Sequence, residues 1–199
     1  MSRIDETRRD QQEGPVAEPA PTGRGVRLPR RARRAQLLTA AREVFVAQGY
    51  HAAAMDDIAE RAGVSKPVLY QHFPGKLDLY LALLDESCDA MINAAAAALE
   101  STDDNKQRVT ATMHAFYQYV AGAEGAFRLV FESDLRNDAD VRTIVDRGTG
   151  ACVEAIAEVI AADTGADTER ALLLASGLTG LAESSARWWL PPGDRCPCL

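Results

Sequence analysis

The sequence predicts an all-α fold, with an N-terminal three-helix helix-turn-helix domain joined to a C-terminal helical bundle. From about residue 33, apolar residues recur every three or four positions, which is the spacing of one helix face. No stretch shows the apolar–polar alternation of a strand or the turn residues of a hairpin. Gly49 and Gly63 interrupt the helical pattern, so we expect separate helices before residue 80 and longer ones after it.

Composition divides the chain into three parts. Residues 1–31 are rich in Arg, Glu, Gln, Pro and Gly without an apolar period, so we interpret them as a disordered basic arm. Residues 32–78 hold the helix-turn-helix pattern, and residues 79–199 hold longer helices. A basic run leads into the first helix and consists of Arg24, Arg27, Arg30, Arg31, Arg33 and Arg34. Such a run is either solvated charge or an arm that reaches phosphates or a minor groove, and both interpretations stay open.

The net charge of −7 is unevenly distributed. Residues 24–80 carry ten Lys or Arg against five Asp or Glu, whereas residues 81–199 carry nine against nineteen. A basic segment joined to an acidic body suits a protein that touches phosphate at one end only. Because the chain has no membrane-spanning apolar stretch and no signal-peptide core, we expect a cytoplasmic protein without a membrane partner.

The cysteines and histidines do not indicate a metal site or an enzyme. Cys88 and Cys152 lie among apolar neighbours in helical patterns, where buried reduced thiols are expected. Cys196 and Cys198 have no second Cys or His cluster nearby. No HExxH, Gly-rich phosphate loop or GxSxG motif is present. We therefore expect no metal, no cofactor and no catalytic residue, and a helical enzyme is the remote alternative.

The helices follow one another in a regular order. The first has an apolar face, and Gly49 supplies its left-handed stop. The apolar faces of the long helices are Leu37, Leu38, Ala41, Val44 and Phe45; Tyr80, Leu84, Cys88, Met91 and Ala95; Val109, Met113, Phe116, Tyr117 and Val120; Val141, Ile144, Val145, Cys152, Ile156 and Val159; and Leu174, Leu178, Leu181 and Ala182. The run Pro191-Pro192-Gly193 must end the last helix.

The most informative stretch is residues 55–76. Gly63 breaks a short helix because glycine accepts the positive φ of a tight turn. Ser65 is placed to cap a second short helix through its hydroxyl, and Pro67 fits its first turn. The inward positions of the second helix are Leu69 and Phe73, and the more exposed ones are Lys66, Val68, Tyr70, Gln71 and His72. Helix, glycine turn, helix is the arrangement whose second helix enters the DNA major groove.

A longer pattern surrounds this motif in fixed order. It reads Phe45-x-x-x-Gly49-Tyr50, then Met55-Asp56-Asp57-Ile58-Ala59, then Ala62-Gly63-Val64-Ser65-Lys66-Pro67-x-Leu69-Tyr70-x-His72-Phe73-x-x-Lys76. This pattern closely resembles the TetR family of transcriptional regulators over roughly residues 33–80. The remaining residues resemble the family only in style, as long helices of weakly constrained sequence.

The resemblance implies DNA contacts at the matching positions. Lys66, Pro67 and Gln71 would approach base edges, Tyr70 and His72 would hold phosphates, and Lys76 would meet a phosphate where the next helix begins. A Gln amide can pair bidentately with adenine. Alternatively, Tyr70 packs, His72 is an exposed helix-end residue and Lys76 is a solvated charge. The candidate DNA-binding residues are Ser65, Lys66, Pro67, Tyr70, Gln71, His72, Lys76, Arg33 and Arg34.

One position departs from the family pattern. Ala54 stands where family members carry a Thr or Ser that caps the helix and often touches phosphate. Losing such a cap costs about 1 kcal/mol of helix stability. Asp56 and Asp57 partly compensate in the first turn, where negative charge suits the helix dipole. The same carboxylates would repel DNA if they pointed outward.

The C-terminal body is expected to dimerise and to hold a ligand. The helices near 138–162 and 167–190 are the expected dimer surface, since helix-turn-helix units read two half-sites as pairs. Gly148, Gly150, Gly177 and Gly180 would permit close helix approach, although packing within one chain explains them nearly as well. The candidate pocket residues are Met91, Met113, Phe116, Tyr117, Phe127, Phe131 and Trp188, which also suit a plain core.

Together these features predict a sequence-specific regulator, expected to be a repressor, that binds palindromic double-stranded DNA as a homodimer. A small-molecule effector of unknown identity would release it. The alternative is a ligand-independent DNA-binding regulator. Its C-terminal domain would only dimerise or bind a protein partner. A pocket of roughly 300 Å³ or more favours the effector, and a tightly filled core favours the alternative.

Overall fold

The computed structural model describes residues 28–122, 125–131, 135 and 137–190. Within these ranges the chain forms helices and no strand, which confirms the all-α prediction. The helices are α1 (Arg30–Ala52), α2 (Met55–Arg61), α3 (Lys66–His72), α4 (Lys76–Glu100), α5 (Asn105–Gly122), α6 (Ala126–Phe131), α7 (Ala139–Thr164) and α8 (Thr168–Trp189). None of these helices is long and apolar enough to cross a membrane.

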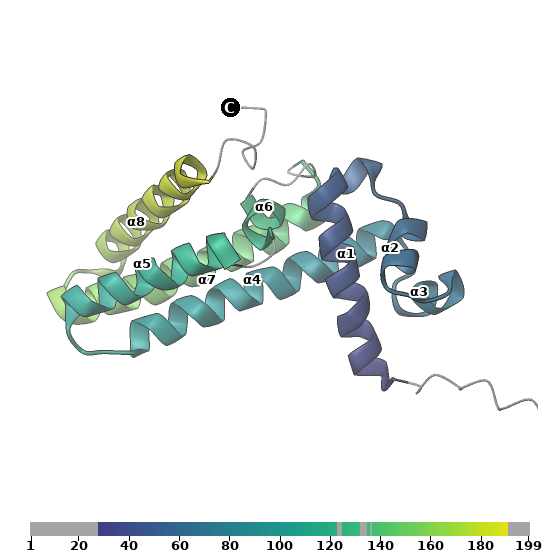
Figure 1. Ribbon diagram of the computed structural model, residues 1–199. Coiled ribbons are helices and arrows are strands. Elements are labelled where there is room, and N and C mark those ends of the chain that lie inside the picture. Colours follow the sequence, from purple (N-terminus) through teal and green to yellow (C-terminus); the bar gives the residue numbers. More distant parts are fainter. Residues whose placement is uncertain (1–27, 123–124, 132–134, 136, 191–199) are drawn as a thin grey trace, which may run out of the picture.

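Helices α1, α2 and α3 form a small unit at one end of the molecule (Figure 1). Gly49 has a φ of +78° and kinks α1, so the predicted stop is present as a break three residues before Ala52. Gly63 has a φ of +64°. The N–H groups of Gly63 and Val64 donate to the carbonyls of Glu60 and Ala59, each at 3.0 Å. This pair of backbone hydrogen bonds is a Schellman motif, and it fixes the turn between α2 and α3.

Helix α4 belongs to both halves of the molecule. It begins beside α1 to α3 and runs along the body next to α5 and α7 (Figure 1). Its first turns pack against α1, and the helices α5, α6 and α7 also pack on it. Tyr80, Leu84, Cys88 and Met91 are all buried, as the sequence pattern predicts. The boundary expected after residue 78 therefore lies inside the first turn of a continuous helix.

Small residues decide how closely α7 approaches its neighbours. A Cβ atom added at Gly148 would lie 2.9 Å from Cys88 Sγ, so the glycine lets α7 pack tightly on α4. Helix α8 buries a stripe of Ala171, Ala175, Ala182 and Ala186. The leucines predicted to face inward are instead largely exposed, namely Leu174 (49%), Leu178 (51%) and Leu181 (65%). The inward face of α8 is the alanine stripe because its short side chains allow the closer contact.

We predict that Gly148→Ala destabilises the protein relative to Gly150→Ala. Both changes gain the same helix propensity, but only the first places a methyl group against Cys88, whereas Gly150 faces open space. Overpacking of this kind costs about 1–3 kcal/mol. Urea unfolding of the two variants measures the difference, and equal midpoints would contradict the close α4–α7 contact.

Candidate nucleic-acid interface and pocket

Helix α3 presents one face to solvent and the other to the core. Leu69 and Phe73 are 0% and 2% exposed, which confirms both as inward positions. Pro67 lies in the first turn as predicted. Ser65 precedes the helix in an extended conformation, but its hydroxyl makes no capping hydrogen bond, so the predicted side-chain cap is wrong. The helix-opening conformation is set by the preceding turn, which leaves the Ser65 side chain exposed.

The exposed face of α3 carries most of the predicted contact residues. Lys66, Pro67, Tyr70 and Gln71 are exposed, and His72 is half-buried. Pro67, Tyr70 and Gln71 share one side of α3, because residues three and four apart lie on the same face of a helix, whereas His72 lies on another side. Val68, expected with the exposed group, is also only half-exposed.

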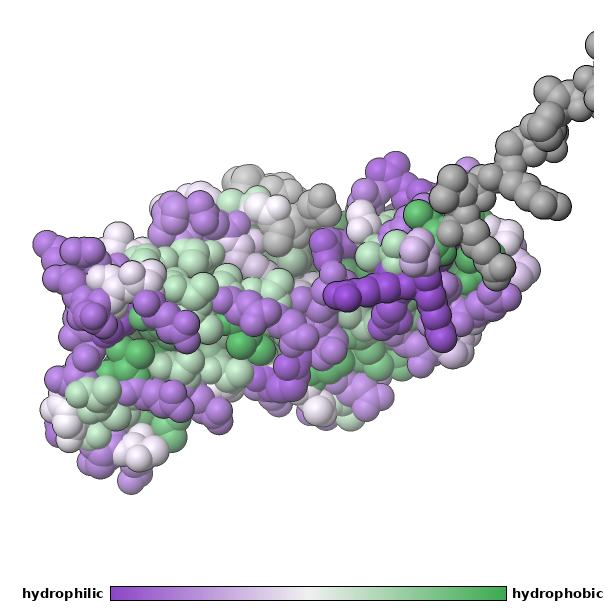
Figure 2. All heavy atoms as spheres, turned by 90° about the horizontal axis from the view of Figure 1, so that it is seen from below, coloured by the Kyte–Doolittle hydropathy of each residue, from purple (hydrophilic) through white to green (hydrophobic). Residues whose placement is uncertain are grey.

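Arginines from the start of α1 lie beside the end of α3. The Arg34 guanidinium stands over the Phe73 ring, 4.5 Å from its centroid. Partial burial lowers the pKa of His72, and the nearby charges of Arg30, Arg34 and Arg33 lower it further. Strongly hydrophilic side chains stand out on the face of the molecule that Figure 2 shows. The structure thus brings Arg33, Arg34 and His72 together, whereas Arg24 and Arg27 lie outside the described residues.

A hydrogen-bond chain fixes the start of α1 against the turn that precedes α3. Arg33 Nη1 donates to Gln36 Oε1 at 2.7 Å. Gln36 Nε2 in turn donates to the carbonyl of Ala62 at 2.8 Å. The basic end of α1 is therefore held in a defined position relative to the helix-turn-helix.

Lys66, the first residue of α3, forms an ion pair with Asp56 in the first turn of α2. The Nζ–Oδ2 distance is 2.6 Å, and the two side chains are 60% and 58% exposed. The hydrogen bond and the charge of Asp56 raise the pKa of Lys66. Sequence reasoning assigned Asp56 only to the helix dipole and missed this partner, because a spacing of ten residues across a turn is not a helical spacing.

Lys76 binds the end of the α1 segment rather than open solvent. Its Nζ donates to the carbonyls of Tyr50 at 2.8 Å, Ala53 at 2.9 Å and His51 at 3.3 Å. It also lies 4.5 Å from the centroid of the Tyr50 ring. An ammonium has three N–H donors, and each has an acceptor here. The expected phosphate contact of Lys76 stays a prediction, and it would require giving up these bonds.

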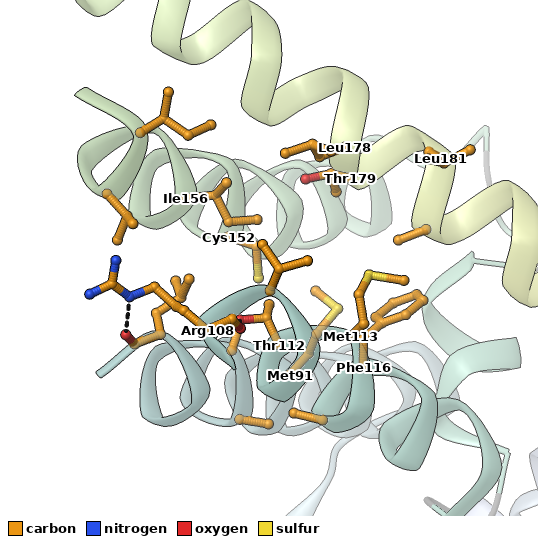
Figure 3. Close-up of a pocket in the computed structure, with 18 of the residues that line it drawn as sticks. Met91, Arg108, Thr112, Met113, Phe116, Cys152, Ile156, Leu178, Thr179 and Leu181 are labelled. Carbon is orange, nitrogen blue, oxygen red and sulfur yellow. Dashed lines mark hydrogen bonds between the residues drawn. The ribbon is translucent and has the colours of Figure 1, made fainter. Parts of the chain in front are cut away.

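An apolar pocket of about 360 Å³ lies between α4, α5, α7 and α8. Figure 3 shows Met113 and Phe116 from α5 facing Leu178, Thr179 and Leu181 from α8. Cys152 and Ile156 line the α7 side, and Met91 lines the α4 side. Arg108 lies at one end, where its Nη1 is 3.0 Å from Asp163 Oδ2.

The pocket contains only part of the set predicted for it. Met91, Met113, Phe116 and Phe131 line it. The predictions for three other residues are wrong. Tyr117 donates its hydroxyl to Ser185 Oγ at 2.7 Å, Phe127 is buried in the core, and Trp188 is 77% exposed. The sequence missed aliphatic lining residues such as Ile156 and Leu178, because they carry no signature that separates a pocket wall from a core.

The thiols of the described residues are unreactive in character. Cys88 and Cys152 are free and buried, as predicted. Burial raises the pKa of Cys88 to about 11. No group of three or more His, Cys, Asp or Glu side chains that could hold a metal occurs in the described part of the chain. Cys196 and Cys198 lie outside it.

Comparisons with known proteins agree with this arrangement. Residues 37–83 match the family described as bacterial regulatory proteins, tetR family. Over 167 residues the chain is 48% identical to the HTH-type transcriptional activator FasR of Mycolicibacterium smegmatis, covering 84% of this chain and 76% of that protein. The chain belongs to the TetR family. It is thus a DNA-binding transcriptional regulator with a helix-turn-helix.

Solved structures of TetR-family proteins share the whole architecture. A TetR-like regulator from Rhodococcus sp. RHA1 superposes with a TM-score of 0.67 at 27% identity, covering 80% of this chain and 85% of that one. A tetR-family regulator from Streptomyces coelicolor gives a TM-score of 0.70 at 27% identity, covering 85% of this chain and 75% of that one. The likeness therefore includes the C-terminal helices of this TetR-family regulator as well as its helix-turn-helix.

We predict that Lys76→Met lowers the free energy of unfolding by about 1–3 kcal/mol, because it leaves carbonyls that lose a charged donor. Lys66→Met is the matched control, since its ammonium has one exposed carboxylate partner, and such pairs contribute about 0–1 kcal/mol. Urea unfolding measures both variants. Equal losses, together with a salt dependence of DNA binding that becomes shallower only in Lys76→Met, would instead assign Lys76 to phosphate.

Proposed function

We propose that this TetR-family regulator binds a palindromic operator as a homodimer through α3, and that a small apolar effector in the pocket between α4, α5, α7 and α8 controls it. The observation that carries the DNA-binding part is the exposed face of α3 beside the arginines of α1. Because its DNA lies in the cytoplasm, the protein acts there.

Each exposed residue of this surface has a proposed part in operator binding. Lys66, Pro67 and Gln71 contact base edges from α3. Hydroxyl, imidazole and guanidinium groups around them hold the phosphates and set the register. The proposed phosphate-binding residues are Ser65, Tyr70, His72, Arg33 and Arg34.

Dimerisation is proposed through the outer face of α8 and the adjoining part of α7. Leu173 and Trp188 are 71% and 77% exposed in the single chain. Gly177 and Gly180 on α8 face open space, which leaves room for a second helix. Large apolar side chains exposed along one helix are typical of an interaction site. A twofold axis through α8 would place two α3 helices for two half-sites.

The effector proposal is supported by the size and lining of the pocket. Its volume of about 360 Å³ reaches the size of small-molecule sites, which begin near 300 Å³. Met91 of α4 lines the pocket, and Lys76 at the start of α4 binds the α1 segment. An occupant that displaces α4 would therefore move the helix-turn-helix. This observation favours the effector over the alternative of a body that only dimerises.

The direction of regulation is set by where the operator lies relative to the promoter. The sequence expectation of a repressor stays a prediction, and the relative aligned over most of this chain is named an activator. That relative and the matching family are transcriptional regulators, which favours a regulator over a helical enzyme.

We predict that selection from a random duplex pool yields a palindrome for the wild-type protein and a single half-site for Leu173→Glu. A glutamate at a 71% exposed leucine leaves the fold intact but places a charge in the proposed dimer surface. Sedimentation should show a dimer for the wild-type protein and a monomer for Leu173→Glu.

Thr110→Glu is the control for charge, because this exposed residue lies on α5, outside the proposed dimer surface. It should keep both the dimer and the palindrome. A Leu173→Glu protein that stays dimeric would move the interface away from α8. No enriched half-site with the wild-type protein would remove the operator-reading role of α3.

We also predict that the fluorophore anilinonaphthalene sulfonate, an anion with apolar rings, binds the wild-type protein in this pocket. Thr112→Trp should weaken its binding about ten-fold or more by filling space, since Thr112 lines the pocket. Thr110→Trp adds the same ring on the same helix but outside the pocket, and should leave binding unchanged. Equal titration curves for the two variants would favour the ligand-independent alternative.

A further inference from the structure

The Lys66–Asp56 ion pair lies on the protein surface, where an ion pair adds little to the free energy of unfolding. Both side chains are more than half exposed, with the Nζ–Oδ2 distance at 2.6 Å. Exposed ion pairs of this kind contribute little to folding stability. The pair nevertheless holds a lysine at the first position of α3 in one direction, and places a carboxylate of α2 directly beside it. The ion pair therefore matters for the hydrogen-bond donors and acceptors that the two side chains offer to a ligand.

The pair presents donors and an acceptor side by side. The ammonium has three N–H groups, and Asp56 Oδ2 takes one, so two remain for another partner. The second carboxylate oxygen of Asp56 remains an acceptor. The charges compensate each other, which removes the repulsion that a lone carboxylate would have for DNA. A ligand that fits must offer two adjacent acceptors next to one donor.

The major-groove edge of a G·C base pair has this pattern. Guanine offers N7 and O6 as neighbouring acceptors, and cytosine offers the N4 amino donor. In an A·T pair the adenine N6 donor stands between the N7 and O4 acceptors. The ammonium then finds no adjacent pair of acceptors, so the match is poorer.

We propose that Lys66 and Asp56 act as one unit that reads a G·C base pair in each half-site. Lys66 donates to guanine N7 and O6, and Asp56 accepts from cytosine N4. This inference rests on the proposed function of α3 as the helix that enters the major groove. It makes Asp56 a specificity-determining residue, although it lies outside α3 and carries the same charge sign as DNA.

The test is a double-mutant cycle on the operator selected by the wild-type protein. Affinities are measured for that operator and for copies in which each G·C pair is changed to A·T. At one position per half-site the wild-type protein should prefer G·C by about ten-fold. Asp56→Ala and Lys66→Ala should each reduce this preference to about two-fold, and the double variant should be no worse than either single one.

Asp57→Ala is the matched control, because it removes a neighbouring carboxylate of the same first turn. It should keep the ten-fold preference at that position. If Asp56→Ala keeps the preference and binds all sequences more tightly, the carboxylate only repels DNA and the proposal is overturned. It is equally overturned if Asp56→Ala keeps the G·C preference at every position with unchanged affinity.

These failures are distinct from failure of the proposed function. In the latter case the wild-type protein would enrich no half-site at all. Retained preferences at the other positions in Asp56→Ala would show that the variant is folded and that α3 still reads the operator.

Discussion

Helix α4 must satisfy two different sets of neighbours with one rigid backbone. Its first turns pack against α1, and its later turns pack against α5 and α7. A helix of 25 residues is about 37 Å long, and it transmits a displacement at one end to the other. Lys76 ties the first turn to three carbonyls of the α1–α2 segment, and Gly148 lets α7 lie tightly on the middle. The position of α3 therefore depends on how the body holds α4.

The pocket follows from the way α8 packs. Alanines bring α8 close to α7, but they are too short to fill the space towards α5. The Tyr117 hydroxyl and Ser185 Oγ join α5 to α8 near one end, at 2.7 Å, and Arg108 joins α5 to α7 near the other. Between these contacts the apolar side chains of four helices leave a cavity open (Figure 3). The same choice of an alanine face leaves Leu173 on the outside of α8, where it is 71% exposed and available to a partner.

Local constraints made the helix-turn-helix predictable from sequence. Gly63 must take a positive φ and Pro67 must occupy a first turn, and both do. Which residues each helix buries against its neighbours was harder to predict from the sequence. The period of α8 fits two apolar faces, and only tertiary contact decides that Ala175 rather than Leu174 is buried. Aromatic residues were overestimated as pocket lining for a related reason, because a side chain such as Phe127 fills a core as readily as it lines a cavity.

Lys66 and Lys76 show why residue type alone does not assign a DNA contact. Both are lysines at positions where the family resemblance implies contact with DNA. Lys76 donates to carbonyls of the α1–α2 segment, so releasing its ammonium leaves partly buried acceptors without a charged donor. Lys66 shares its ammonium with one exposed carboxylate, and among the described residues its other two N–H groups have no acceptor. The lysine able to contact DNA at little cost is the one whose protein partner leaves donors free, and that partner then becomes part of the contact.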